Sequence, residues 1–200
     1  MPRSWLKRTC LTAIIYVLAV ASARASGDDP LYADLPNFHK VNEHLFRGGQ
    51  PEAGGIARLK SLGIRTIVNL RHEPERVETE KAEAVGAGLR YFNVPMHGLD
   101  RPTDEQVARV QALLLEPENW PVFVHCKAGA DRTGVMIAYY RIVQAGWSAE
   151  EAIREALGYG MMKLEFRKRA FIREVYAGLQ SAGGKLTIEA AAAPAPATPR

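Results

Sequence analysis

Short apolar segments alternate with longer amphipathic segments along most of the chain. The apolar segments are rich in β-branched residues and end at glycine or proline, which is typical of buried strands. The amphipathic segments begin at capping residues or proline and end near glycine, which is typical of helices. Strands are expected at 44–47, 65–70, 89–94 and 122–124, and helices at 51–62, 75–85, 103–115, 133–144, from 148 onward and at 163–179.

This alternation predicts the fold class. Strands separated by helices form parallel βαβ units. We therefore expect an α/β fold with a single domain over residues 38–182, in which a central, mostly parallel sheet is flanked by helices. In such a sheet, the reacting groups lie where the carboxyl ends of the strands meet the following helices.

The two segments that flank this domain have a different composition. Residues 26–37 are polar and interrupted by proline, and they are expected to form an exposed N-terminal segment. Residues 183–200 are rich in alanine and proline. Such a composition cannot bury enough surface to order itself, so a disordered tail is predicted there.

Residues 1–25 have the organisation of an export signal. Lys7 and Arg8 precede an apolar run, and A-x-A sequences ending at Ala23 and Ala25 offer cleavage sites. The run is shorter than the roughly 20 residues that a transmembrane helix needs. The expected product is a periplasmic or secreted protein with no stable membrane span after cleavage. The alternative is a membrane protein anchored by an uncleaved N-terminal segment.

The net charge of +4 does not point to a nucleic-acid partner. Four basic residues and no acidic ones lie within the first 25 residues. Without that segment, 22 basic residues face 22 acidic ones, so the remaining chain is formally neutral. A nucleic-acid-binding domain would show a basic excess.

Cysteine usage is sparse. Cys10 lies in the predicted signal peptide, and Cys126 is the other cysteine of the chain. After cleavage, Cys126 would be a single thiol in an oxidising compartment without an intramolecular partner. Such a thiol is either deeply buried or retained for chemistry.

The surroundings of Cys126 favour chemistry. Residues 122–134 read as a strand, a tight loop that contains glycine, and a helix start. Successive loop N–H groups and a helix N-terminus together form an anion cradle. Thiols in such a position ionise more readily than free thiols. The planar guanidinium of Arg132, at the end of the loop, can hold two phosphoryl oxygens.

The segment His125–Gly134 has the form H-C-x5-R-[ST]-G, and it resembles the cysteine-based protein tyrosine and dual-specificity phosphatases. The resemblance covers roughly residues 40–180. Residues 45–51, 62–64 and 66–71 look like the compact bacterial members of the dual-specificity type.

The resemblance implies a role for each matching residue. Cys126 would carry the phosphoryl group, Thr133 would support its thiolate, and His125 would orient the loop by hydrogen bonding. The phosphate would be bound by the loop amides and the arginine side chain, over Lys127, Ala128, Gly129, Ala130, Asp131 and Arg132. The family mechanism needs neither a metal nor a cofactor.

A general acid must protonate the leaving oxygen, and the resemblance places it on a loop upstream of the cysteine. Asp100 and Asp104 are the candidates. The start of a helix already explains a carboxylate at Asp104. Asp100 lies in an open loop without such a reason, so we favour Asp100.

The substrate class stays open at this point. A phosphorylated protein, with phosphotyrosine first, is the leading interpretation. A phosphoinositide or inositol phosphate is the second, because Asp131 and Lys127 resemble the loops of lipid phosphatases. A catalytically weak module that binds phosphorylated partners is the third, although such a module needs no nucleophile.

Other polar residues are interpreted as structural. Arg47 and Arg71 are each expected to pair with a nearby acid. The histidines outside the signature have no spacing typical of a metal site and are expected at the surface: His39, His44, His72 and His97. The basic positions of the last helix are expected to be solvated, with membrane contact as the alternative: Lys163, Arg167, Lys168 and Arg169.

Overall fold

The computed structural model describes residues 32–98 and 100–183, and its centre is one five-stranded sheet with the strand order β1-β2-β5-β3-β4. Strands β2, β5, β3 and β4 are parallel, and β1 pairs with β2 in the antiparallel direction. The mostly parallel sheet confirms the predicted fold class. The strands are β1 His39–Lys40, β2 Leu45–Gly48, β3 Thr66–Asn69, β4 Arg90–Asn93 and β5 Val122–His125.

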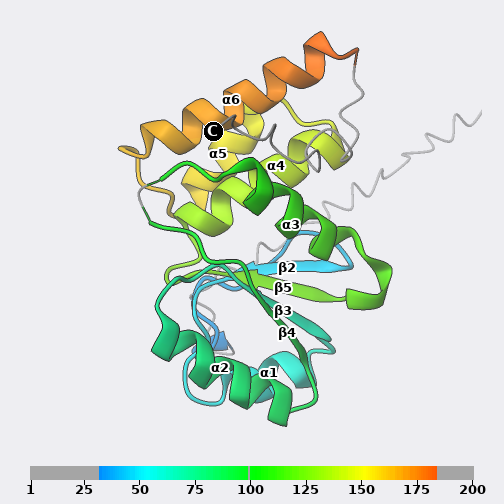
Figure 1. Ribbon diagram of the computed structural model, residues 1–200, viewed down its shortest axis with the longest axis vertical. Coiled ribbons are helices and arrows are strands. Elements are labelled where there is room, and N and C mark those ends of the chain that lie inside the picture. The colour runs from blue at the N-terminus through cyan, green and yellow to red at the C-terminus, as the bar shows by residue number, and fades with distance from the viewer. Residues whose placement is uncertain (1–31, 99, 184–200) are drawn as a thin grey trace, which may run out of the picture.

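Helices cover both faces of the sheet (Figure 1). Two helices lie on one face, α1 Gly55–Ser61 and α2 Pro74–Gly86. The other face carries a larger layer of four helices, α3 Asp104–Leu115, α4 Asp131–Ala145, α5 Ala149–Gly158 and α6 Phe166–Ser181. A short 3-10 helix, Pro117–Asn119, leads from α3 towards β5.

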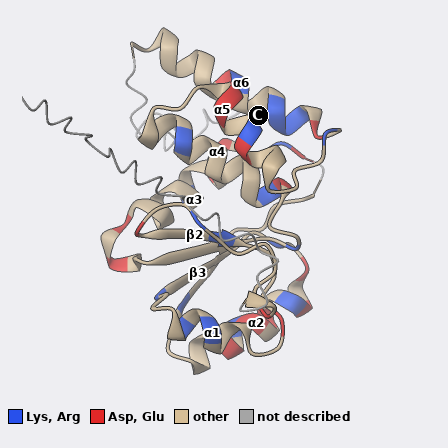
Figure 2. Ribbon diagram, turned by 180° about the vertical axis from the view of Figure 1, so that it is seen from behind, with Lys and Arg blue, Asp and Glu red and all other residues tan. Residues whose placement is uncertain are grey.

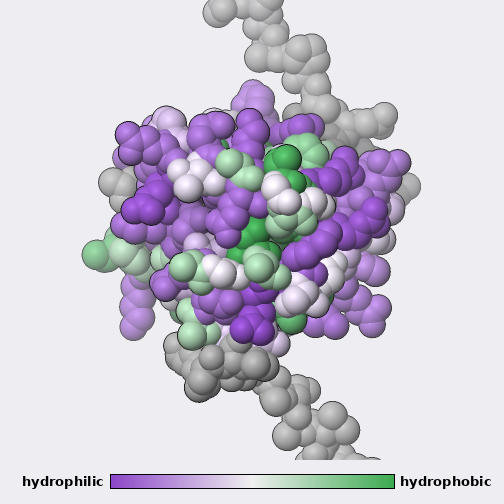
Figure 3. Space-filling view, turned by 90° about the horizontal axis from the view of Figure 1, so that it is seen from below, coloured by the Kyte–Doolittle hydropathy of each residue, from purple (hydrophilic) through white to green (hydrophobic). Residues whose placement is uncertain are grey.

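Strand β5 divides the core. Val122 and Val124 belong to the apolar cluster shared with α3 to α6, and Phe123 belongs to the cluster shared with α1 and α2. All four residues of the strand are buried. The continuous apolar run therefore reflects a central strand that is covered on both faces. In contrast, the outer side of the α1–α2 layer is mostly hydrophilic (Figure 3).

The helices differ from the predictions mainly at their starts. Helix α3 begins at the expected capping box of Thr103 and Gln106, and α5 begins at that of Ser148 and Glu151. Helix α1 starts later than expected, because Gly54 adopts a left-handed conformation just before it. The strand β1 was not predicted, since two residues carry no periodic signal.

The prediction of an exposed segment at 26–37 is wrong for its described part. Leu35 is fully buried and belongs to the core cluster under α1 and α2. The carbonyl of Pro36 accepts a hydrogen bond from Gly49 N–H. One apolar side chain among polar and proline neighbours was enough to anchor the segment. The predicted signal peptide, residues 26–31 and the tail from 184 lie outside the described residues.

The register places three strand ends together. Gly48 of β2 and Asn69 of β3 are both opposite His125, the last residue of β5. The residues that follow these strands therefore converge around Cys126. Within residues 32–98 and 100–183, no helix is long and apolar enough to cross a membrane.

Candidate active site

The predicted cradle forms between β5 and α4. Cys126 follows the last residue of β5 and is 3% exposed. Residues 127–130 make the loop, and α4 begins at Asp131. The nucleophile, the loop and a helix N-terminus are thus brought together as predicted, at the carboxyl end of the central strand.

Consecutive carbonyl groups of this loop are held by residues outside it. Lys127 C=O accepts from the Gln50 N–H at 3.0 Å, Ala128 C=O accepts from Asn37 Nδ2 at 3.0 Å, and Gly129 C=O accepts from Arg47 Nη2 at 2.7 Å. In a trans peptide, the C=O and the following N–H point in opposite directions. The amides of residues 128–130 are therefore turned to the opposite side, where an anion would bind.

Gly129 makes this arrangement possible. Its φ is +70°, and a Cβ there would lie 2.4 Å from Gly48 C and 2.6 Å from Gly49 N. Only glycine fits both the left-handed conformation and the close approach to β2. The Gly48-Gly49 pair after β2 thus acts as the outer wall of the loop.

Arg132 lies in the first turn of α4 and is 7% exposed. Its Nη1 donates to Met96 C=O at 3.1 Å and lies 3.4 Å from His72 Nδ1. The rings of His72 and His97 are 4.6 Å apart. Both histidines are exposed as expected, but their place beside the arginine of the signature was not foreseen. They follow β3, which is next to β5, and β4, which pairs with β3 on its other side.

Within the described part of the chain, Arg47 does not form the expected structural ion pair. It is fully buried, donates to the loop at Gly129, and its guanidinium lies 4.5 Å from the centre of the Tyr159 ring. Burial lowers the pKa of Arg47 to about 10, although the charges of Glu155, Tyr159 and Cys126 act to raise it. Arg47 therefore remains charged at neutral pH and adds a positive field beside the thiol. In contrast, Arg71 pairs as expected, with its Nε 3.1 Å from Glu73 Oε2.

His125 connects the loop to a buried acid. Its Nδ1 lies 3.2 Å from Cys126 C=O, and its Nε2 lies 2.9 Å from Glu80 Oε1. Burial alone would raise the pKa of Glu80, but His125 and the hydrogen bonds of its neighbours, Gln50 and Tyr91 among them, hold that pKa below its ordinary value. Tyr91 also donates to Glu80, and burial raises the pKa of that phenol. The two ring nitrogens of His125 thus face the loop carbonyl and the Glu80 carboxylate, in keeping with an orienting role.

Comparisons with known proteins agree with this geometry. A family model described as "DSP-PTPase phosphatase fused to NAD+ Kinase" matches residues 30–174. The dual specificity protein phosphatase TpbA of Pseudomonas aeruginosa is 30% identical over 164 residues, which cover 77% of this chain and 72% of that protein. The chain belongs to the cysteine-dependent DSP-PTPase phosphatases.

Further comparisons of this phosphatase name two kinds of substrate. Inositol diphosphatase DSP4 of Arabidopsis thaliana is 28% identical over 155 residues, covering 76% of this chain and 77% of that protein. A crystal structure of a TpbA variant in complex with pTyr has 26% identity and a TM-score of 0.61, and it covers 80% of this chain and 98% of that chain. The phosphatase therefore has relatives named for two classes of phosphate ester.

Asp131 is explained by the structure of the phosphatase loop. Its Oδ1 accepts from the Met162 N–H at 2.9 Å, so the carboxylate ties the start of α4 to the segment between α5 and α6. A carboxylate facing a bound phosphate would repel it, but this oxygen is engaged outside the loop. Lys127 is exposed at the loop surface.

The two candidate acids of the phosphatase lie in different settings. The Asp100 side chain is 63% exposed, and its Oδ1 lies 3.8 Å from Arg167 Nη1. Asp104 is the first residue of α3 and lines a cavity with Tyr139, whose pKa is raised by burial and by the charge of Asp104. Asp104 thus lies at a helix start, as its sequence position predicted.

Thr133 is fully buried, and its hydroxyl makes no hydrogen bond to the described residues. The expected bond to the Cys126 sulfur is therefore not formed in this structure, although the hydroxyl remains free to make it. Among residues 32–98 and 100–183, no group of three or more His, Cys, Asp or Glu side chains is gathered as metal ligands would be.

Proposed function

We propose that this phosphatase hydrolyses phosphotyrosine in protein substrates after export from the cytoplasm. The observation that carries the proposal is the set of loop carbonyls turned away from Cys126, because it leaves the amides and Arg132 to receive the phosphoryl oxygens. The pTyr complex of a TpbA variant supports the choice of substrate. The exposed imidazole rings of His72 and His97 beside Arg132 also suit a flat aromatic leaving group.

The reaction has two displacements. The Cys126 thiolate attacks phosphorus, an S–P bond forms, and the P–O bond to the leaving group breaks while Asp100 gives that oxygen its proton. A water molecule then attacks the cysteinyl phosphate and passes a proton back to Asp100. The S–P bond breaks, and the thiolate leaves with support from the Thr133 hydroxyl. Arg132 and the loop amides stabilise the equatorial oxygens in both transition states.

A second substrate class is an inositol phosphate or phosphoinositide. Two exposed basic residues support it, since Lys127 lies in the loop and Arg167 lies beside Asp100. They could pair with further phosphate groups on the same substrate. The relationship to DSP4 also supports this class.

The test compares phosphate release by the protein and its Cys126→Ser variant under reducing conditions. The panel contains a phosphotyrosine peptide, a phosphothreonine peptide, a phosphoinositide and an inositol pyrophosphate. We expect the highest kcat/KM for the phosphotyrosine peptide and no turnover by Cys126→Ser. A higher value for an inositol substrate would replace the proposed substrate class. Absence of turnover by the unmodified protein would instead indicate a phosphate-binding module.

Export is tested separately, by expressing the chain with its own N-terminus in a Gram-negative bacterium. We expect a periplasmic product that begins at Arg24 or Ser26, after one of the A-x-A sites. A full-length product in the membrane fraction would show an uncleaved anchor and contradict the proposal.

A further inference from the structure

The loop that carries Asp100 is held at its start by the active site itself. It leaves β4 and runs to the first turn of α3. Met96 C=O accepts from Arg132, and Pro95 C=O accepts from Gln106 Nε2 at 2.7 Å. Beyond Met96, these contacts no longer fix the chain. Something else must hold Asp100, because a proton donor has to lie within hydrogen-bond reach of the leaving oxygen.

Lys168 of α6 reaches this part of the loop. Its side chain is fully buried, and its Nζ donates to Gly98 C=O and lies 2.7 Å from Glu165 Oε2. Glu165 is 5% exposed. The prediction of a solvated lysine is therefore wrong, because a partner three residues earlier and a backbone carbonyl satisfy its charge. The basic residues of α6 gather in its N-terminal half, next to this loop (Figure 2).

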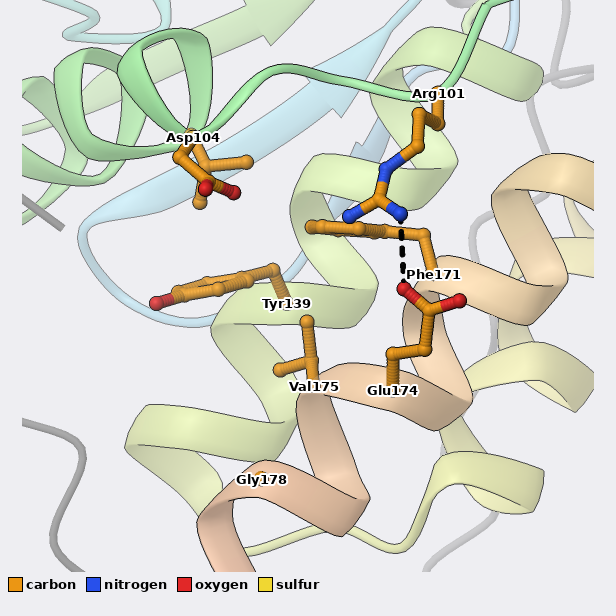
Figure 4. A pocket seen from close by; sticks show the side chains of 8 residues that line it. Arg101, Asp104, Tyr139, Phe171, Glu174, Val175 and Gly178 are labelled. Atoms are coloured by element: carbon orange, nitrogen blue, oxygen red, sulfur yellow. Dashed lines mark hydrogen bonds and ion pairs between the residues drawn. The ribbon is translucent and has the colours of Figure 1, made fainter. Parts of the chain in front are cut away.

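The residue after Asp100, Arg101, lines a cavity next to α6. Arg101 Nη1 lies 2.9 Å from Glu174 Oε2, and its guanidinium lies over the Phe171 ring (Figure 4). Between α3, α4 and α6, a cavity of about 260 Å³ is lined by the side chains that Figure 4 shows, among them Tyr139 and Val175. Arg101 therefore borders an open space, and it contacts α6 through its ion pair and the Phe171 ring. Further polar contacts join the loop to α6 at Gly98 and Asp100.

These polar contacts are not of equal weight. The side chains of the Arg101–Glu174 pair are 52% and 58% exposed, and those of the Arg167–Asp100 pair are 75% and 63% exposed. Exposed pairs contribute little, since water competes for both charges. Lys168 and Glu165 are shielded from water, and a buried charge that loses its partners is costly. The contact of Lys168 with Gly98 is therefore the strongest polar link between α6 and the loop.

We infer that Lys168 is a positioning residue for the general acid. It holds Gly98, two residues before Asp100, and thereby sets the carboxyl group over the bond that breaks. Lys168 does not touch the reacting atoms. The inference rests on the proposed role of Asp100. It gives α6 a function in addition to packing against the core, which is all that its amphipathic sequence pattern indicates.

The test uses leaving groups of different basicity. A nitrophenyl phosphate departs without much help, whereas phenyl phosphate needs its oxygen protonated. The variant is Lys168→Met combined with Glu165→Gln, so that no buried charge is left alone. We expect kcat for phenyl phosphate to fall about 10²-fold, the cost of a small displacement of a catalytic group, and kcat for the nitrophenyl ester to fall much less.

A double-mutant design separates positioning from general damage. In the Asp100→Asn background, the Lys168 and Glu165 substitutions should cost no further activity on phenyl phosphate, because the group they position is gone. Equal losses on both esters, or an additive loss in that background, would overturn the inference. If Asp100→Asn itself leaves the leaving-group dependence unchanged, the assignment of the acid fails, and this outcome is distinct from failure at Lys168.

Two controls complete the design. Arg173 lies on α6, as Lys168 does, and Arg173→Met removes its exposed ion pair with Glu150 of α5. This variant should leave turnover of both esters unaffected. The NMR chemical shifts and order parameters of the Gly98, Asp100 and Arg101 amides give a measurement independent of turnover. Lys168→Arg keeps the charge and should leave these values close to those of the unmodified protein. Unchanged shifts and order parameters in the Lys168→Met, Glu165→Gln protein would overturn the inference.

Discussion

His125 Nε2 and Glu80 Oε1 lie 2.9 Å apart immediately before Cys126, in a buried contact whose side chains are 0% and 4% exposed. Because the folded protein holds the pKa of Glu80 below its ordinary value of 4.5, the charged carboxylate stabilises the fold. This contribution is fully present above about pH 4.5. It is lost as the pH falls through the lower pKa of the folded state.

Glu80→Gln should therefore lower the free energy of unfolding by about 3–5 kcal/mol at pH 7. The difference from the unmodified protein should shrink as the pH falls below 4.5, and urea denaturation at several pH values measures it. Glu73→Gln is the control. A hydrogen bond from Arg71 lowers the pKa of Glu73 to about 2, but this side chain is 37% exposed, so about 1 kcal/mol or less is expected. A pH-independent deficit in Glu80→Gln would contradict the charge argument.

Gly129→Ala should damage both stability and turnover. The left-handed conformation alone costs an alanine about 1–2 kcal/mol. The new Cβ would also meet backbone atoms of Gly48 and Gly49 closer than 3 Å, adding about 1–3 kcal/mol of overpacking. Gly146→Ala is the matched control, because Gly146 also has a φ of +70° but has nothing within 4 Å of the added Cβ. Equal losses of stability in the two variants would contradict this argument, because they would show that the loop accommodates the added Cβ without a further energetic cost.

Asp100→Asn should lower kcat by about 10²–10⁴-fold for esters with basic leaving groups, since a general acid contributes that much. Asp104→Asn should leave turnover unchanged and cost about 0.3–1 kcal/mol of stability, the value of a carboxylate at a helix start. The opposite ranking of the two variants would move the general acid to Asp104.

Chelation and vanadate should act in opposite ways. Arg132, Arg47 and the loop amides supply the positive field around the phosphate, so EDTA should leave the initial rate unchanged. Vanadate adopts a trigonal-bipyramidal geometry like that of the transition state and should inhibit competitively with substrate. Loss of turnover in EDTA that zinc or magnesium restores would contradict the metal-free mechanism.

The sequence predicted the parts of this molecule whose signals are local. The capping boxes of Thr103 and Ser148 start their helices as expected, and the apolar run at 122–124 is the central strand. Cys126 and Arg132 were recognisable because strand, loop and helix follow one another within a few residues.

The supporting residues were missed for a physical reason. Asn37 meets the loop 91 residues away along the chain, and Lys168 meets Gly98 across 70 residues. Asparagine and lysine are usually solvated, and periodicity shows only which side of an element is apolar. A buried polar contact between distant segments leaves no local pattern. Glu80 was missed for the same reason, because in the sequence it looks like any other charged residue of an amphipathic helix.

The outer support of the loop comes from the beginning of the domain: Asn37 precedes β1, Arg47 lies in β2, and Gly49 and Gln50 follow β2. This has a consequence for moving the chemistry into another scaffold. A fragment that starts after residue 50 would retain Cys126, Arg132 and the whole signature. It would lack all the hydrogen-bond donors that hold the loop carbonyls on the side away from the anion site. The smallest segment that would carry this active site into another protein therefore extends from about residue 36 to α4. The signature alone lacks the residues that hold the loop in place.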